Sequence, residues 1–208
     1  MKVVLYGASG MIGSRILNEL LARGHQVTAV VRNPDKVTAS GAIVVKGDIT
    51  DAASVAATAK GQDAAISAYA PPSAQVSLLQ DATRSLLAGI EKAGVKRLLM
   101  VGGAGSLEVA PGVQLVDTPE FPAAWKAIAL AHRDVLLSLK TSSLDWTYLS
   151  PAAFIQPGER TGSFRLGTTR LVVDEKGESR ISAEDFAVAM VDELEKPRRL
   201  RQQFTAAY

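Results

Sequence analysis

Short apolar runs alternate with longer amphipathic stretches along most of this chain. The apolar runs have the length of buried strands, and the stretches between them repeat hydrophobic residues at helical spacing. The pattern predicts strands over residues 2–6, 26–31, 42–46, 62–68, 95–101 and 144–149, and helices over residues 14–23, 52–59, 75–93, 123–139 and 181–195. Because regular alternation of strands and helices is typical of a parallel sheet covered on both faces, we predict an α/β fold with a doubly wound parallel sheet.

Three glycines, Gly7, Gly10 and Gly13, connect the first predicted strand to the first helix. In a dinucleotide-binding turn, the first glycine permits the tight turn and the second lets the backbone approach a pyrophosphate. The third lets the helix pack closely against the sheet. The helix N-terminus adds free N–H groups and the positive end of a dipole. Ordinary turns also use glycines, but this order of strand, glycines and helix favours nucleotide binding.

The end of the second strand indicates which nicotinamide cofactor is preferred. A fold that prefers NAD usually has Asp or Glu about 20 residues after the glycines, where the carboxylate accepts from the ribose 2′-hydroxyl. This chain has Arg32 there, with Lys36 one helical turn later. A guanidinium suits a 2′-phosphate, so the pattern predicts NADPH over NADH, although a solvated arginine would look the same in sequence.

The turn after the third strand offers contacts for an adenine ring. The Asp48 carboxylate can accept from the adenine amino group while the Ile49 N–H meets a ring nitrogen. Helix capping explains acidic residues here equally well, because Thr50 or Asp51 directly precedes the helix at 52–59.

Small residues follow the fourth and fifth strands. Ligands of open parallel sheets lie beyond the carboxyl ends of the strands, where Ala68 and Ala70 would let a cofactor pass close to the backbone. Tyr69 between them would stack or hydrogen-bond there, or would simply pack the loop. Gly102 and Gly103 at the end of the fifth strand again suggest backbone close to a ligand.

The last third of the chain contains the predicted substrate side. Pro151 and Phe154 follow the sixth strand, where the nicotinamide half of a cofactor is expected. We predict that 151–181 forms a small substrate-side segment, with a hairpin over the site at 158–173. The loop at 108–122 is expected to be a substrate lid or a disordered segment, and 202–208 an edge strand.

Composition and charge narrow the class of protein. The 208 residues, 47% of them hydrophobic, fit one domain over 1–208, and a net charge of +2 with interspersed signs gives no basic stripe for nucleic acid. With no cysteine and two distant histidines, no metal site is expected. No apolar run has membrane-spanning length, and the first strand begins without a signal-like segment. We expect a cytoplasmic monomer or homodimer whose partner is a small molecule, not nucleic acid or a membrane.

Several of these segments occur together in one known group of proteins. They are residues 7–13, 31–34, 47–51, 101–106, 144–148 and 182–187. In this order they resemble the atypical short-chain dehydrogenase/reductases of the NAD(P)H-binding, NmrA-like group. The similarity is closest to bacterial proteins described as NADH-flavin reductases and to biliverdin-IXβ/flavin reductase. The resemblance implies a Rossmann fold and hydride transfer from NAD(P)H to a flavin or quinone-like acceptor, with flavin as a substrate rather than a prosthetic group.

The resemblance also implies roles for individual residues. It adds Ser9, Met11 and Ile12 to the three glycines of the pyrophosphate turn. It gives Arg32 the role of 2′-phosphate reader, gives Asp48 and Ile49 the adenine contacts, and puts 68–70 beside the ribose.

The chain departs from the carbonyl-reducing members of that group. Those enzymes use a Tyr-x-x-x-Lys pair on the helix after the fifth strand, where this chain has no tyrosine, and Gly102-Gly103 replaces the usual serine pair. An acceptor such as flavin can take its proton from solvent, so a site built for stacking and positioning suffices. The polar candidates for catalysis are Tyr69, Ser106 and Lys126, while His132 is interpreted as a packed or surface residue.

Two other functions are compatible with this sequence. The missing Tyr-Lys pair favours a non-catalytic NADP(H)-sensing regulator of the NmrA type, whereas the small size of the chain favours the enzyme. An isomerase or epimerase that uses a bound cofactor is a weaker hypothesis, because those reactions need an acid-base residue that the sequence does not reveal.

Overall fold

The computed structural model describes residues 1–72 and 74–208. Its main sheet has the strand order β10-β12-β8-β5-β4-β1-β2-β3, and only β10 runs antiparallel to its neighbour. The strands of this sheet are β1 (Lys2–Tyr6), β2 (Gln26–Val31), β3 (Ile43–Lys46), β4 (Ala64–Ser67), β5 (Arg97–Val101), β8 (Asp145–Ser150), β10 (Arg165–Gly167) and β12 (Gln202–Ala207). The six predicted strands are all present, in parallel.

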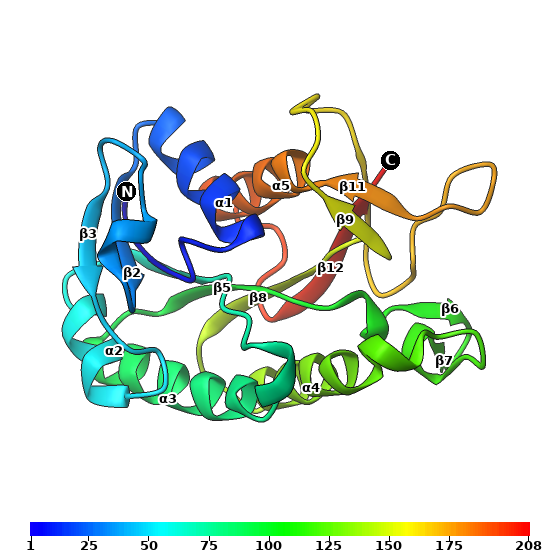
Figure 1. Cartoon of the computed structure of the whole chain (residues 1–208), viewed down its shortest axis with the longest axis horizontal. Helices are drawn as coiled ribbons and strands as arrows, with labels where there is room; N and C mark the ends of the chain where they lie inside the picture. Colours follow the sequence, from blue (N-terminus) through cyan, green and yellow to red (C-terminus); the bar gives the residue numbers. More distant parts are fainter.

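Helices cover both faces of the sheet (Figure 1). One face is covered by α1 (Met11–Ala22) and α5 (Ala183–Glu195), and the other by α2 (Ala52–Ala59), α3 (Leu78–Ala93) and α4 (Ala123–Lys140). Successive residues of a strand point to opposite faces, so Leu5 packs in the first layer and Tyr6 in the second. This arrangement confirms the predicted doubly wound fold.

The first helix starts earlier than the pattern of apolar residues predicted. It begins at Met11 rather than at residue 14, because Gly10 is the N-cap, in an extended conformation. The glycine turn therefore leads directly into the helix, and the first N–H groups of α1 lie at the end of β1. The helix α5 begins at Ala183, two residues later than predicted, because residues 180–182 form a strand, and the Ser182 hydroxyl caps the helix by accepting from the Asp185 N–H at 3.0 Å.

Two predictions about the C-terminal segments are wrong. The segment 202–208 was expected at an edge, but β12 lies between β8 and β10. The segment 158–173 was expected to fold on itself as a hairpin. Instead, its strand β10 pairs with β12, from Arg165 opposite Ala207 to Gly167 opposite Thr205. The hydrogen-bonding partner is about 40 residues away in sequence, so local patterning could not reveal it.

Two small sheets lie beside the main one. β9 (Phe154–Gln156) pairs in parallel with β11 (Arg180–Ser182), and β6 (Glu108–Ala110) pairs with β7 (Val113–Gln114). Glu108 also exchanges backbone hydrogen bonds with the C-terminal part, because its N–H donates to the Thr169 carbonyl at 2.8 Å and its carbonyl accepts from the Leu171 N–H at 2.9 Å. The base of the 108–122 segment is therefore attached to another part of the fold rather than free.

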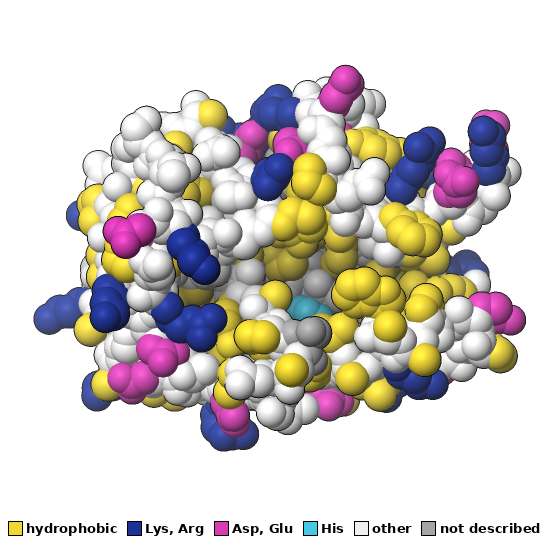
Figure 2. Space-filling view, viewed as in Figure 1, with side chains coloured by type: hydrophobic (Ala, Val, Ile, Leu, Met, Phe, Trp, Pro, Cys, Tyr) yellow, Lys and Arg dark blue, Asp and Glu magenta, His cyan; other side chains and the backbone are white. Residues whose placement is uncertain are grey.

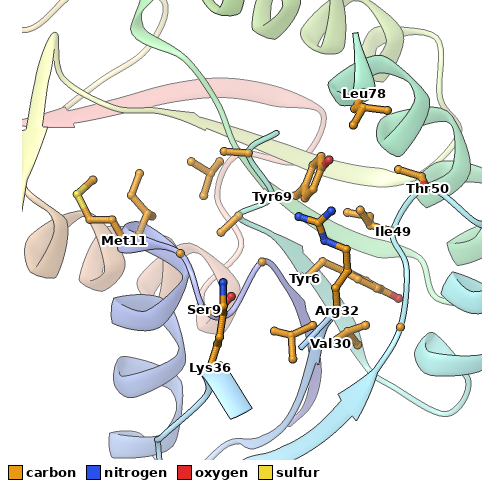
Figure 3. Close-up of a pocket in the computed structure, with 18 of the residues that line it drawn as sticks. Tyr6, Ser9, Met11, Val30, Arg32, Lys36, Ile49, Thr50, Tyr69 and Leu78 are labelled. Atoms are coloured by element: carbon orange, nitrogen blue, oxygen red, sulfur yellow. The ribbon is translucent and has the colours of Figure 1, made fainter. Parts of the chain in front are cut away.

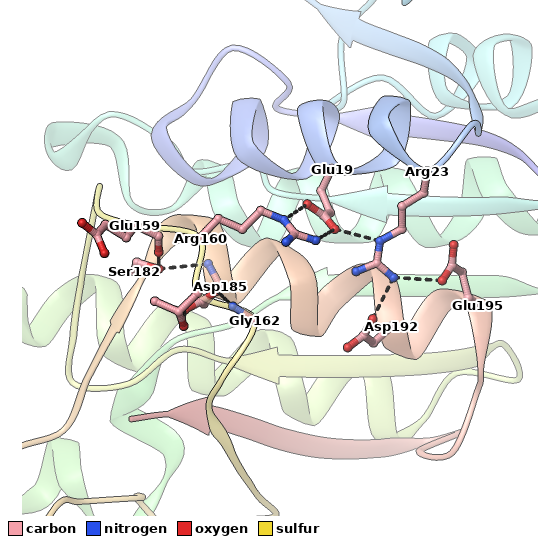
Figure 4. Close-up of polar contacts among 10 residues, drawn as sticks. Glu19, Arg23, Glu159, Arg160, Gly162, Ser182, Asp185, Asp192 and Glu195 are labelled. Carbon is pink, nitrogen blue, oxygen red and sulfur yellow. Dashed lines mark hydrogen bonds and ion pairs between the residues drawn. The ribbon is translucent and has the colours of Figure 1, made fainter.

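Carboxylates on α1 and α5 hold the connection between β9 and β10 (Figure 4). Glu19 accepts two hydrogen bonds from the Arg160 guanidinium, both at 2.8 Å, and one from Arg23 at 2.7 Å. These contacts lower the pKa of Glu19, with the Arg160 hydrogen bond as the largest cause. Because Glu19 is itself buried, its charge is retained by the two arginines.

Asp185 secures the same connection from α5. Its carboxylate is fully buried and accepts from the Gly162 N–H at 2.7 Å, the Thr161 hydroxyl at 2.5 Å and the Tyr208 hydroxyl at 2.9 Å. Three segments that are distant in sequence therefore meet at one carboxylate: the β9–β10 connection, the start of α5 and the last residue of the chain.

This geometry predicts that Asp185→Asn lowers the free energy of unfolding by about 1–3 kcal/mol, because an amide turns a donor toward one of the three donors and leaves it unpaired. The neighbouring Glu184→Gln is the matched control. Glu184 is half-buried, pairs with Arg15 at 2.9 Å and accepts from the Gly158 N–H at 2.7 Å. Because the amide oxygen of the variant can still accept from Gly158, only the ion pair is lost, which should cost less than about 1 kcal/mol. Urea unfolding of both variants measures the difference, and equal losses would contradict the role of Asp185.

Candidate cofactor-binding site

A groove of about 660 Å³ crosses the carboxyl ends of the central strands (Figure 3). It lies where the strand order reverses between β1 and β4, which is the usual ligand site of an open parallel sheet. Of the predicted cofactor contacts, the lining includes Gly7, Ser9, Gly10, Met11, Ile12, Arg32, Asp48, Ile49, Ala68, Tyr69, Ala70, Gly102 and Pro151.

Backbone atoms pack closely against the first and last glycines of the turn. Gly7 has a φ of +82°, and a Cβ there would lie 2.6 Å from the Ala68 carbonyl oxygen. A Cβ on Gly13 would lie only 2.0 Å from the Gly7 oxygen, so this glycine packs against the turn and is not part of the lining. Gly10, the N-cap of α1, makes no side-chain cap. The first N–H groups of α1 are thus available to a phosphate, and this cradle fits a pyrophosphate.

Charged groups gather at the β2 and β3 end of the groove. Figure 3 shows the Arg32 side chain extending toward the Tyr69 ring, and Lys36 also belongs to the lining. Asp48 accepts from the Thr50 N–H at 2.9 Å and from its hydroxyl at 2.7 Å, and these bonds lower the pKa of Asp48, with a smaller contribution from Arg32. This end therefore offers two cations beside a carboxylate whose charged form is favoured by its hydrogen bonds, a set that fits a phosphorylated adenosine.

The opposite end of the groove is formed by the ends of β5 and β8 together with α4 and β9. Its lining consists of Val101, Gly102, His132, Pro151 and Ile155. Figure 2 shows this face as a hollow with hydrophobic side chains gathered around it and a histidine inside. His132 thus contributes to the wall, whereas the sequence interpretation made it a packed or surface residue.

Tyr148 explains the glycines that end β5. Its ring lies beneath Gly102, where a Cβ would come within 2.2 Å of the Tyr148 Cε1 atom. The Tyr148 hydroxyl donates to the His132 carbonyl at 2.8 Å and accepts from the Gly103 N–H at 3.3 Å, and burial raises the pKa of Tyr148 above its usual range. Gly103 in turn packs against His132 and is not in the lining. The sequence attributed both glycines to a ligand. Protein packing requires a glycine at each position, and only Gly102 also lines the groove.

The three candidates for catalysis do not converge at this end. Tyr69 lies beside Arg32, at the charged end, and burial raises its pKa. Ser106 is buried outside the lining, where its hydroxyl donates to the Gly103 carbonyl at 3.3 Å and accepts from Gln203 at 2.9 Å. Lys126 is an exposed residue near the start of α4 and is also outside the lining.

The predicted cofactor contact at Phe154 is displaced by one residue, to Ile155. Its side chain is 73% exposed and outside the lining, whereas Ile155 belongs to the lining. Because residues 154–156 form a strand, neighbouring side chains point to opposite faces. Without the strand, the sequence could not tell which of the two would face the groove. Asn33, Thr50 and Leu78 also line the groove without having been predicted as contacts. Asn33 and Thr50 lie next to the predicted contacts Arg32 and Ile49, and Leu78 is the first residue of α3, where its helical spacing indicated only a core position.

The half-buried His132, whose ring is largely enclosed by protein, gives a testable pH dependence. Burial lowers its pKa from 6.5 to about 4. Between these values the unfolded chain takes up a proton that the folded chain does not, so stability falls as the pH drops below about 6.5 and is constant for this group above it. We expect the wild type to lose about 2 kcal/mol more than His132→Gln between pH 7 and pH 4.5 in urea unfolding. Equal losses would contradict a buried neutral imidazole.

Known proteins show the same architecture. A candidate exported protein of Burkholderia pseudomallei is 54% identical, with a TM-score of 0.91 over all of both chains. A candidate epimerase of Bacteroides thetaiotaomicron is 43% identical, with a TM-score of 0.92 over all of this chain and 96% of the other. A candidate NADH-flavin reductase of Streptococcus pneumoniae is 35% identical, with a TM-score of 0.90 over all of this chain and 99% of the other.

The sheet order and the glycine turn at its switch point define a protein with the dinucleotide-binding Rossmann fold. The chain belongs to the NAD(P)H-binding family, whose model matches residues 7–197, and it is similar to members of the atypical short-chain dehydrogenase group. None of the helices that the structure describes combines the length and the hydropathy needed to cross a bilayer. The cytoplasmic location stays a prediction.

Proposed function

We propose that this protein is an NADPH-dependent reductase that transfers a hydride to a flavin or quinone-like acceptor. The observation that carries the proposal is the two-ended groove, which has cations at one end and a neutral wall at the other. The bound nicotinamide would supply the hydride. The similarity to a candidate NADH-flavin reductase supports the class of acceptor.

The cofactor assignments follow the geometry of the groove. Gly7 and Gly10, with the N-terminus of α1, would hold the pyrophosphate, and Arg32 with Lys36 would hold the 2′-phosphate and so favour NADPH. Asp48 keeps one oxygen free of the Thr50 hydrogen bonds and would accept from the adenine amino group. The nicotinamide would then lie toward the opposite end, near Pro151.

The wall around the nicotinamide end would act by positioning. Val101, Pro151 and Ile155 offer apolar surface against which a planar acceptor can stack, and His132 is the polar side chain of that lining. A flavin or quinone takes a hydride and one proton, and water can supply the proton without a Tyr-Lys pair. In this proposal Tyr69, Ser106 and Lys126 take no part in proton transfer.

The test combines binding with turnover. NADPH binding is titrated first, and NADPH oxidation is then followed with FMN, riboflavin and a simple quinone in turn. We expect tight binding and oxidation that depends on an added acceptor. Tight binding without oxidation by any acceptor would contradict the reductase and favour the NADP(H)-sensing protein, and the next search would then be for a protein partner.

A further inference from the structure

The nicotinamide end of the groove has a distinct chemical character. Its half-buried Val101 and Ile155 and its buried Pro151 present aliphatic surface from three separate elements, β5, β9 and the end of β8. The imidazole of His132 completes the wall, and because burial lowers its pKa to about 4, this ring is neutral at physiological pH. The described lining of this end is therefore apolar with one neutral polar group.

The cations of the groove lie far from this wall. Arg32 follows β2 and Pro151 follows β8, and these strands are four positions apart in the sheet. At roughly 4.8 Å between neighbouring strands, the ends of β2 and β8 are about 19 Å apart, and the Arg32 side chain reaches only to Tyr69 after β4, two strands short of β8. Arg133, the neighbour of His132 on α4, is turned toward Asp117 at 3.2 Å. The 2′-phosphate of a bound cofactor would pair with Arg32 and Lys36, so neither cation would be left to bind an acceptor.

We propose that the acceptor end selects uncharged ring systems and discriminates against acceptors that carry a phosphate. This inference rests on the proposed reductase function and narrows its acceptor to neutral flavins and quinones. A planar uncharged ring gains apolar contact with Val101 and Ile155 and exchanges one hydrogen bond with His132. A phosphate brought to the same wall loses water without gaining a cationic partner.

Riboflavin and FMN are the appropriate probes because they share one ring and differ by one phosphate. Both are fluorescent, so quenching by the NADP⁺-saturated protein measures their dissociation constants without turnover. We expect riboflavin to bind at least about 10-fold more tightly than FMN. The rates of NADPH oxidation with riboflavin and with FMN then give a second, independent measure of the preference between the two flavins.

Two variants at Ile155 isolate the effect of charge. Ile155→Lys places an ammonium in the wall, and it should shift the FMN-to-riboflavin affinity ratio toward FMN by about 10-fold or more. Ile155→Gln is the matched control, because it is polar and of similar length but uncharged, and it should change both affinities in parallel. Thermal unfolding verifies that both variants fold. If Ile155→Lys does not fold, the wild-type ratio still decides the question.

Each outcome has one meaning. Equal or stronger FMN binding by the wild type would overturn the selection of uncharged rings and leave the reductase intact. A ratio that Ile155→Lys and Ile155→Gln change equally would show that the wall around Ile155 does not determine selectivity. Binding of NADPH without binding or reduction of either flavin or a quinone would overturn both proposals together.

Discussion

Gly13→Ala is expected to raise the dissociation constant for NADPH more than about 100-fold and to lower the free energy of unfolding by about 3 kcal/mol. A Cβ at Gly13 would lie 2.0 Å from the Gly7 oxygen, 2.8 Å from the Gly7 carbonyl carbon and 3.3 Å from the Ala8 Cα. All three atoms are backbone, so no side chain can move aside and α1 must shift away from β1. An NADPH titration and urea unfolding measure the two effects.

Gly10→Ala separates binding from folding at the same turn. A Cβ there would lie 3.4 Å from the Gly7 oxygen, which is near ordinary contact, so the fold should lose less than about 1 kcal/mol. NADPH should still bind more weakly, because Gly10 lines the groove where the pyrophosphate is expected to approach the backbone closely. If Gly13→Ala bound NADPH as the wild type does, the turn would not be the phosphate site.

Arg32→Glu is expected to reverse the preference between the two nicotinamide cofactors. The NADPH dissociation constant should rise about 100-fold or more, because a carboxylate replaces the guanidinium and repels the 2′-phosphate, whereas NADH affinity should change little. Arg32 is an exposed side chain of the lining and makes no structural ion pair among those the structure describes, so the fold should be unaffected. Titration of the wild type and of each variant with NADPH and with NADH gives the ratio of the two dissociation constants.

Arg32→Gln is the control for this charge reversal. It removes the positive charge without adding a negative one, so its NADPH affinity should lie between those of the wild type and Arg32→Glu. Lys36 would retain part of the attraction in both variants. An unchanged ratio of NADPH to NADH affinity in Arg32→Glu would show that Arg32 does not read the 2′-phosphate.

The adenosine end of the groove could be predicted because its determinants are local in sequence. Gly7 and Gly13 lie in one turn, and Arg32 directly follows a strand whose length the apolar pattern defines. Gly7 and Arg32 reach the groove from their own strands and turns, and Gly13 supports the same turn from the first part of α1. The alternation of strands and helices likewise determines the doubly wound sheet, since a parallel strand pair requires a crossover between its members.

The nicotinamide end required the tertiary structure, because its residues come from elements that are distant in sequence. Whether His132 faces solvent or the groove depends on the rotation of α4 against β5 and β8, and Gly102 and Gly103 are explained by Tyr148 and His132 packing from elsewhere. The choice between Phe154 and Ile155 depends on β9 pairing with β11 about 26 residues away. Sequence alone therefore determined the sheet and the phosphate turn, which short-range rules specify, whereas long-range packing decided which side chains form the acceptor wall.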